Sequence, residues 1–316
     1  MMKNPIEVPL IPDCAPCIMS SLKILVPLLA QDFDTQAEYF AIAFRTLSEG
    51  YTRKTPPVQL SIEIYRDLYT RAGIRDPYAD IKRTSTKAAL KALPVIEERM
   101  KGLKGYALLR ACLASAITGN VIDFNTAGHE PDLERLAEAF EGIMTTGFAI
   151  DDSEHLWKTL ESKRGRLLYL ADNAGEVILD IPLLRLTKSL GWKTTFIVKG
   201  RPMINDATVE DVRGTEIEVL ADVEDNGAWA HGVPIQFVGK KFLRRVAESD
   251  LVISKGQANI ETFPEIQIQT NVETYYVTRA KCAHISQAVG AKKNDNVVLR
   301  QPKSEAIFPR VNVDTC

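Results

Sequence analysis

The chain has 316 residues, of which 45% are hydrophobic and 25% are charged, and its formal net charge is −2. This composition is typical of a soluble globular protein of roughly two domains, and it gives no electrostatic basis for binding nucleic acid or an anionic membrane. No segment approaches the roughly 18 apolar residues of a membrane span and the N-terminus lacks a signal-peptide pattern, so we expect a cytoplasmic protein.

The first half of the chain is predicted to be helical, and we place a helical domain at residues 1–160. Apolar residues recur at helical spacing over 14–29, 35–49, 58–72, 78–100, 105–119 and 131–145. Asp13 is predicted to cap the first of these helices, and Asp152 precedes a further helix that ends near Gly165. No strand is predicted before about residue 163.

From residue 166 onward, apolar runs alternate with helical stretches. This alternation predicts a doubly wound, mainly parallel α/β sheet domain over residues 161–316. The strands are predicted at 167–171, 194–198, 216–220, 250–253 and 273–278. After the first strand, apolar residues spaced three and four apart over 177–190 predict a helix, which Pro182 adjusts near its start.

Polar turns that contain glycine follow three of these predicted strands. Asp172-Asn173-Ala174-Gly175-Glu176 follows the first strand, Lys199 to Asp206 follows the second, and Ser254 to Glu261 follows the strand at 250–253. Because the carboxyl ends of parallel strands share one edge of a sheet, we expect these turns to meet there. Each turn alone is explained equally well by helix capping or turn geometry, so the functional interpretation depends on all three together.

The residue types in these turns indicate a metal ion and a phosphate. Asp172, Asn173 and Asp206 offer the carboxylate and amide oxygens that Mg²⁺ or Mn²⁺ prefers. Lys255 beside Gly256 supplies a cation and a close backbone approach, as phosphate-binding loops do. Together these groups favour metal-assisted hydrolysis of a phosphate ester.

The same turns resemble the three signatures of the metal-dependent damage-control phosphatases, a family formerly catalogued as domain of unknown function eighty-nine. The matching segments are Asp172 to Glu176, Lys199-Gly200 with Pro202 and Asn205 to Thr208, and Ser254 to Asn259. Gly119 to Phe124 matches a signature in the helical domain of that family. Cys14, Cys17 and the Lys281-Cys282 pair resemble its cysteine-containing prokaryotic branch.

The resemblance implies a helical domain on an α/β domain and a divalent metal ion (Mg²⁺, Mn²⁺, Co²⁺ or Ni²⁺). The implied activity is hydrolysis of small phosphomonoesters, either sugar phosphates or damaged phosphometabolites. The implied metal ligands are Asp172, Asn173 and Asp206, and the implied phosphate contacts are Lys255, Gly256 and Asn259. Glu176 would be a nearby site acid, and Asn120 and Asp123 would face the site from the helical domain or simply end a helix at the domain interface. The chain departs from the pattern at Ala258 and Ile260, where a glycine and an aromatic residue are expected, and this bears on how a substrate packs.

Two interpretations are open for Cys14, Cys17 and Cys282. Their thiolates could converge on zinc or an iron–sulfur centre, but three thiols do not complete a four-ligand site. We favour a structural cluster that is either reduced or disulfide-linked. Among the histidines, His231 is expected nearest the site because it follows the third predicted strand.

The expected mechanism has two alternatives, attack by a metal-activated water or direct attack by a carboxylate of Asp172 or Glu176. One rival function is a carboxyl methyltransferase or nucleotide-type transferase on a similar sheet, which would favour a first turn with more glycines than this one has. A second rival is a non-catalytic metal- or thiol-linked binding protein.

Overall fold

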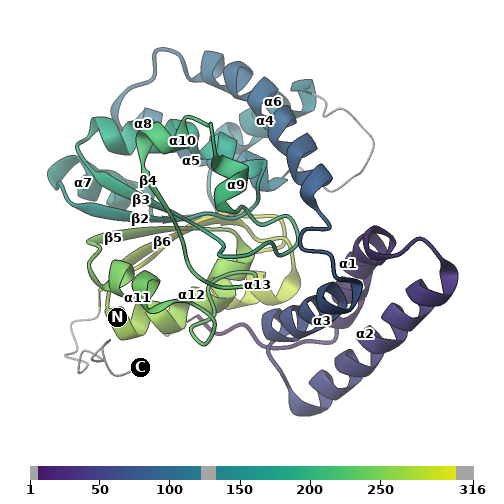
Figure 1. Cartoon of the computed structure of the whole chain (residues 1–316). Coiled ribbons are helices and arrows are strands. Elements are labelled where there is room, and N and C mark those ends of the chain that lie inside the picture. The colour runs from purple at the N-terminus through teal and green to yellow at the C-terminus, as the bar shows by residue number, and fades with distance from the viewer. Residues whose placement is uncertain (1–5, 122–132, 304–316) are drawn as a thin grey trace.

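A seven-stranded sheet forms the centre of the computed structural model, which describes residues 6–121 and 133–303 (Figure 1). Its strands are β1 (Ile150–Asp151), β2 (Arg166–Leu170), β3 (Lys193–Val198), β4 (Asp222–Asp225), β5 (Leu251–Lys255), β6 (Glu273–Arg279) and β7 (Asn296–Gln301). They lie in the order β1-β7-β6-β5-β2-β3-β4, and every neighbouring pair is parallel except β6 with β7. The predicted strands at 167–171, 194–198, 250–253 and 273–278 are therefore confirmed.

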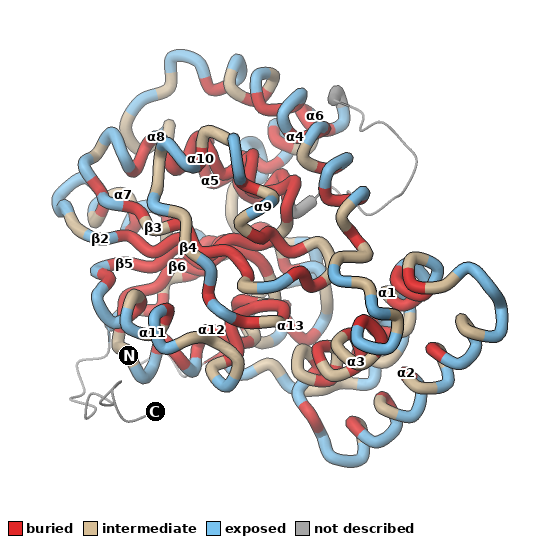
Figure 2. Tube along the Cα trace, in the orientation of Figure 1, coloured by how far each residue is buried: buried red, intermediate tan, exposed pale blue. Residues whose placement is uncertain are grey.

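Helices cover both faces of the sheet, as the prediction of a doubly wound fold requires. Alternate residues of a strand point to opposite faces, so Leu167 and Tyr169 pack on one side while Leu168 and Leu170 pack on the other. The first face is covered by α4 (Ala79–Met100), α5 (Gly105–Val121), α6 (Leu133–Thr146), α7 (Ser153–Ser162) and α8 (Ile181–Ser189). The second face is covered by α11 (Lys240–Ala247), α12 (Gln257–Thr270) and α13 (Ala283–Val289). Figure 2 shows the central strands buried between these layers.

The first three helices form a separate group beside the sheet (Figure 1). They are α1 (Cys14–Leu29), α2 (Phe33–Arg53) and α3 (Pro57–Ala72), and they share an apolar core of their own. Met203 and Trp229, from the loops after β3 and β4, pack against this core. The N-terminal helices are therefore divided between this group and the layer on the sheet, while the domain boundary at 160/161 stays a prediction.

Two sequence predictions about the strands were wrong. Residues 216–220 were predicted as a strand, but Ile217–Leu220 form the short helix α10 and the strand β4 follows it. As an edge strand with acidic residues at three of its four positions, β4 lacks the apolar run that marks a buried strand. The two-residue strand β1 lies before residue 163, where no strand was predicted, because a strand so short leaves no periodicity in the sequence.

Local structure around the remaining predicted elements follows the sequence closely. The predicted helix at 177–190 consists of a 3₁₀ turn, Glu176–Asp180, followed by α8, which has Pro182 in its first turn. Proline is tolerated there because the first helical N–H groups have no partner within the helix.

Asp13 occupies the N-cap position of α1, as predicted, although its side chain makes no capping hydrogen bond. No helix in the described part of the chain combines the length and hydropathy that crossing a membrane requires.

Candidate active site

The three polar turns meet at the centre of the sheet, where the strand order reverses. From β2 the chain adds β3 and β4 on one side, and it adds β5 and β6 on the other. In open α/β sheets such a reversal leaves a crevice at the carboxyl ends of the strands, where ligands bind. The turns after β2 and β3 are joined by a bridge between Asn173 and Asp206 and by a hydrogen bond of 2.9 Å from Ala207 N to Asp172 O.

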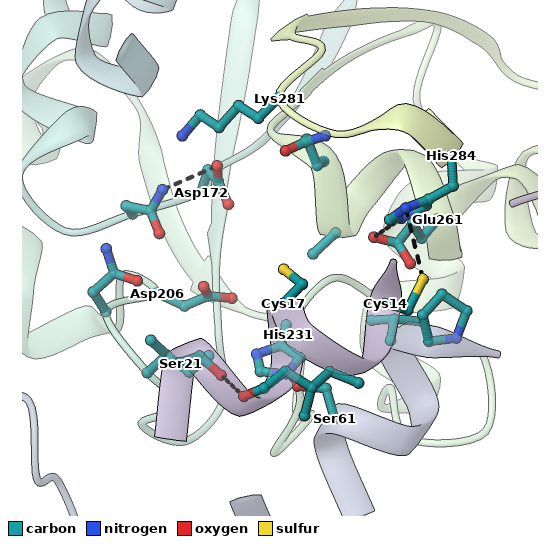
Figure 3. Close-up of a pocket in the computed structure, with 18 residues that line it drawn as sticks. Cys14, Cys17, Ser21, Ser61, Asp172, Asp206, His231, Glu261, Lys281 and His284 are labelled. Carbon is teal, nitrogen blue, oxygen red and sulfur yellow. Dashed lines mark hydrogen bonds and ion pairs between the residues drawn. The ribbon is translucent and has the colours of Figure 1, made fainter. Parts of the chain in front are cut away.

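A cavity of about 310 Å³ opens at this point (Figure 3). Asp172, Asn173 and Asp206 line it from the sheet, so the three predicted metal ligands share one pocket. The opposite wall comes from α1 and α3, which contribute Cys17 and Ser61 among other residues. The pocket therefore lies between the sheet edge and the group formed by α1, α2 and α3.

The side-chain oxygens at this edge fit a hard divalent cation. Asn173 Nδ2 donates to Asp172 Oδ2 and to Glu176 Oε2, both at 3.1 Å, which leaves the carbonyl oxygen of Asn173 for another partner. Asp206 Oδ2 is buried without a hydrogen bond, and Lys199 Nζ lies 3.6 Å from it. Among the described residues no three His, Cys, Asp or Glu side chains are grouped to hold a metal, so a site here needs the amide oxygen of Asn173.

Buried carboxylates crowd this edge, and their pKa values reflect it. Burial, together with the charges of Glu176 and Asp206, raises the pKa of Asp172 to about 8. Burial also raises the pKa of Asp206 to about 6, against the opposing charge of Lys199. A bound cation would offset this accumulation of negative charge, which is the electrostatic setting in which proteins place divalent ions.

The absence of a side chain at Gly256 leaves room for the carboxylate of Asp172. It has a positive φ of 79°, and a Cβ at this position would lie 2.0 Å from Asp172 Oδ2. Only glycine permits both the backbone conformation and this close approach. The predicted cradle residue therefore packs directly against a predicted metal ligand.

Lys255 lies beneath the pocket and does not line it. Its ammonium group is fully buried and donates to Ala116 O at 2.8 Å, Glu176 Oε1 at 2.7 Å and Asp180 Oδ1 at 2.9 Å. An ammonium group has three N–H donors, and three protein oxygens already accept from this one. Its contact with phosphate stays a prediction.

Asn259 also lies below the pocket, where its amide joins the strand ends. Nδ2 donates to Lys255 O at 2.7 Å and to Ala171 O at 3.2 Å, while Oδ1 accepts from Lys199 Nζ at 3.3 Å. Asn120 belongs to the last turn of α5, but its side chain and the whole of Asp123 lie outside the described residues. The preceding residue, Gly119, packs against Glu176, where a Cβ would lie 2.8 Å from Cγ.

Lys281 is a pocket residue to which the sequence analysis gave no role. It follows β6 at the same sheet edge as the other turns, and its side chain extends toward Asp172 in Figure 3. Its charge lowers the pKa of Asp172, against the larger effect of burial. The other turns were found by looking for polar residues at the carboxyl ends of predicted parallel strands. The same search at the end of β6 would have found Lys281.

Two cysteines, Cys14 and Cys282, flank His284 at one end of the pocket. Cys14 Sγ lies 3.8 Å from His284 Nδ1, and Cys282 Sγ lies 3.7 Å from His284 Nε2. Hydrogen bonds with Cys282 and Glu261 raise the pKa of His284 to about 10. Cys14, Cys17 and Cys282 are free thiols, and the described residues assemble no zinc or iron–sulfur ligand set around them.

Sequence comparison identifies the family. The family model described as "Damage-control phosphatase ARMT1-like domain" matches residues 10–297 of this chain. The chain belongs to this family.

Relatives within the damage-control phosphatase family are similar along almost their whole length. A protein of Archaeoglobus fulgidus named damage-control phosphatase is 29% identical over 287 residues, which are 90% of this chain and 97% of that protein. The damage-control phosphatase PH1575 of Pyrococcus horikoshii is 30% identical over 290 residues, 91% of this chain and 96% of its own. The crystal structure of PH1575, described as a DUF89 family protein, matches with a TM-score of 0.81 at 28% identity, covering 93% of this chain and 99% of that chain. These names support a phosphatase-type function.

The two departures from the pattern expected of a damage-control phosphatase fall in different surroundings. Ala258 lines the pocket, whereas Ile260 is fully buried in the core beneath α12. An aromatic residue at position 260 would therefore meet core side chains. A difference in substrate packing is expected from Ala258 alone.

His231 lines the pocket, as expected, and supplies a testable pH dependence. Its Nε2 lies 3.0 Å from Ser61 Oγ, and burial, with the charges of Lys199 and Arg66, lowers its pKa to about 3 from 6.5. Below about pH 6.5 the unfolded chain binds a proton on this histidine that the folded protein does not bind, so this contribution to stability falls as the pH decreases toward 3.

We therefore expect His231→Gln to reduce the acid sensitivity of folding. Urea unfolding of both proteins at pH 6 and pH 5 should show the parent losing about 1 kcal/mol more than the variant over this interval. Equal losses in the two proteins would show that His231 is protonated in the folded state.

Proposed function

We propose that this protein is a divalent-metal-dependent phosphatase that hydrolyses small phosphomonoesters, either sugar phosphates or damaged phosphometabolites. The observation that carries the proposal is the meeting of Asp172, Asn173 and Asp206 with Lys281 around one pocket. Carboxylate and amide oxygens suit Mg²⁺, Mn²⁺, Co²⁺ or Ni²⁺, and a lysine beside them suits a phosphoryl group. The names of the relatives support the phosphatase part of the proposal.

Each pocket residue has a role in this proposal. Asp172, Asn173 and Asp206 would hold the cation, and Lys281 would bind a phosphoryl oxygen. The cation, when bound, would offset charge on the phosphoryl group and lower the pKa of a bound water. His231, neutral near pH 7 and in contact with Ser61, would accept or donate a hydrogen bond to the organic part of the substrate.

Two routes break the bond between phosphorus and the leaving oxygen. In the first, a water oxygen would bond to phosphorus as the bond to the leaving oxygen breaks, and a neighbouring carboxylate would take the water's proton and pass it to the leaving oxygen. In the second, a carboxylate oxygen would bond to phosphorus as the leaving oxygen departs with a proton from solvent, and water would then hydrolyse the acyl phosphate to inorganic phosphate and the free carboxylate. Asp172 lines the pocket, while both Glu176 oxygens already accept hydrogen bonds, so Asp172 is the carboxylate better placed for either role.

The test is a substrate and metal screen. We expect the chelated protein to release no phosphate from a panel of sugar phosphates, and one or more of Mg²⁺, Mn²⁺, Co²⁺ and Ni²⁺ to restore release. Phosphodiesters should remain intact in the same assay. Turnover that is indifferent to chelator would contradict the proposal, and binding of an adenosyl cofactor without metal would favour a methyltransferase or nucleotide-type transferase instead. Metal binding with no turnover of any ester would favour a non-catalytic binding protein.

A further inference from the structure

A buried set of charges, Lys255, Glu176 and Asp180, lies under the turn that carries Asp172 and Asn173, and the roles proposed for the pocket residues do not account for it. We propose that Lys255 is a positioning residue, which acts through Glu176 to hold the amide of Asn173 with its oxygen toward the cation. This inference rests on the proposed function, since it concerns one of the proposed metal ligands. It assigns Lys255 a role different from the phosphate contact that its sequence context predicts.

The first step is the contact between Lys255 and Glu176. Both side chains are at most 1% exposed, and Lys255 Nζ lies 2.7 Å from Glu176 Oε1. The same ammonium group donates to Asp180 Oδ1 at 2.9 Å and to Ala116 O at 2.8 Å. A phosphate oxygen could reach the ammonium group of Lys255 only by displacing one of these acceptors. Lys255 is also not among the residues that line the pocket.

The second step joins Glu176 to Asn173. Glu176 uses its other oxygen, Oε2, to accept from Asn173 Nδ2 at 3.1 Å, and the same Nδ2 donates to Asp172 Oδ2 at 3.1 Å. An amide nitrogen has two N–H groups, so both donors face carboxylates. Rotating the amide by 180° would place its oxygen against two carboxylate oxygens, which is strongly unfavourable. The oxygen of Asn173 is therefore the atom left for a cation.

The group that supports Glu176 must be a cation. Glu176 and Asp180 are buried carboxylates, and an unpaired buried carboxylate is either neutralised or costly. Burial raises the pKa of Asp180 to about 6, while the charge of Lys255 opposes that rise. Lys255 therefore fixes the orientation of Glu176 through a direct contact with Oε1, which keeps Oε2 directed at Asn173 Nδ2. Removing the ammonium group would remove the donor that holds Glu176 in this orientation and loosen its hold on the amide of Asn173.

Two consecutive residues, Lys255 and Gly256, act on two different proposed metal ligands. Lys255 supports Asn173 from below, and the next residue, Gly256, leaves room for Asp172. Partners behind a metal ligand typically change metal affinity by about 10–100-fold when they are removed. Lys281 offers a matched comparison, because it is a lysine that does line the pocket.

The experiment compares Lys255→Met with Lys281→Met in two binding measurements. Titration of the metal-free proteins with Mn²⁺, followed by calorimetry, measures cation affinity; titration with inorganic phosphate at saturating Mn²⁺ measures anion affinity. We expect Lys255→Met to weaken Mn²⁺ binding by about 10–100-fold and to change phosphate binding by less than about threefold. Lys281→Met should do the reverse. Unchanged Mn²⁺ affinity with weakened phosphate binding in Lys255→Met would overturn the inference.

A second variant guards against loss of folding in Lys255→Met. Glu176→Gln keeps the size of the side chain and leaves Lys255 paired with Asp180. Lys255 and Asn173 donate to different oxygens of Glu176, so replacing one oxygen with an NH₂ group sets a donor against one of them. We expect it to weaken Mn²⁺ binding by about tenfold, and an unchanged affinity would overturn the inference. If the parent binds Mn²⁺ and Asp172→Asn does not, while Glu176→Gln and Lys255→Met bind as the parent does, only this inference fails. If the parent itself does not bind a divalent ion, the proposed function fails with it.

Discussion

Asp172→Asn is expected to abolish phosphate release and, at the same time, to stabilise the metal-free protein. The substitution removes one of two carboxylates proposed to bind the cation, and such a cation contributes several kcal/mol of transition-state stabilisation. We therefore expect a loss of about 10³-fold or more in kcat/KM. Stability should rise because the buried carboxylate of Asp172 lies beside those of Glu176 and Asp206.

Phosphate release with excess Mn²⁺ and thermal unfolding with chelator measure the two effects. Asp225→Asn is a matched control at the end of β4, on the same edge of the sheet. Asp225 is exposed and accepts a hydrogen bond from Gly227 N at 2.8 Å, which asparagine would keep. The control should match the parent in both assays. Parent-like activity of Asp172→Asn would contradict the proposed metal site, and a lower melting temperature would contradict the crowding of charges.

Gly256→Ala is expected to lower both the stability of the protein and its phosphatase activity, because it adds a methyl group directly against Asp172. A Cβ would overlap the carboxylate of Asp172, and the backbone has a positive φ that alanine disfavours. Strain and overpacking together should lower the free energy of unfolding by about 2–5 kcal/mol. Displacing Asp172 by about 1 Å should reduce kcat/KM by about 10²-fold.

Gly290→Ala separates the two causes. Gly290 ends α13 with a φ of 78°, close to that of Gly256, but a Cβ there has no neighbour within 4 Å. We expect it to cost about 1–2 kcal/mol of stability from backbone strain and to leave phosphate release unchanged. Denaturant unfolding and the phosphate assay on both variants provide the comparison. Equal losses of stability in the two variants would show that the Asp172 side chain can move away from the added methyl group without lowering the free energy of unfolding.

Much of the fold could be predicted because its signals are local. Buried parallel strands are short apolar runs, and Leu167 to Leu170 or Leu251 to Ile253 can be recognised without knowing their neighbours. The edge strand β4 could not be recognised in this way, since its exposed residues are largely acidic. The helix at Ile217–Leu220 was mistaken for a strand because four residues, three of them apolar, are too few to show a helical period.

The candidate site was predictable to the extent that topology places strand ends together. Asp172, Asn173 and Asp206 line one pocket because β2 and β3 are adjacent and parallel. Lys281 was overlooked although it obeys the same rule, and the contributions of α1 and α3 could not be foreseen. Those helices reach the pocket through packing between segments more than 140 residues apart, such as Ser61 with His231.

The sequence by itself determined which residue types stand at the carboxyl ends of the strands, because strand and turn patterns are set by neighbours along the chain. Only the tertiary structure decided how those side chains share their hydrogen bonds. Lys255 is the last residue of the buried strand β5, and Lys281 follows the buried strand β6. The ammonium group of Lys255 is enclosed by Glu176, Asp180 and Ala116, whereas Lys281 lines the pocket. The acceptors that enclose Lys255 come from elements 75 to 139 residues away, and no local pattern records them.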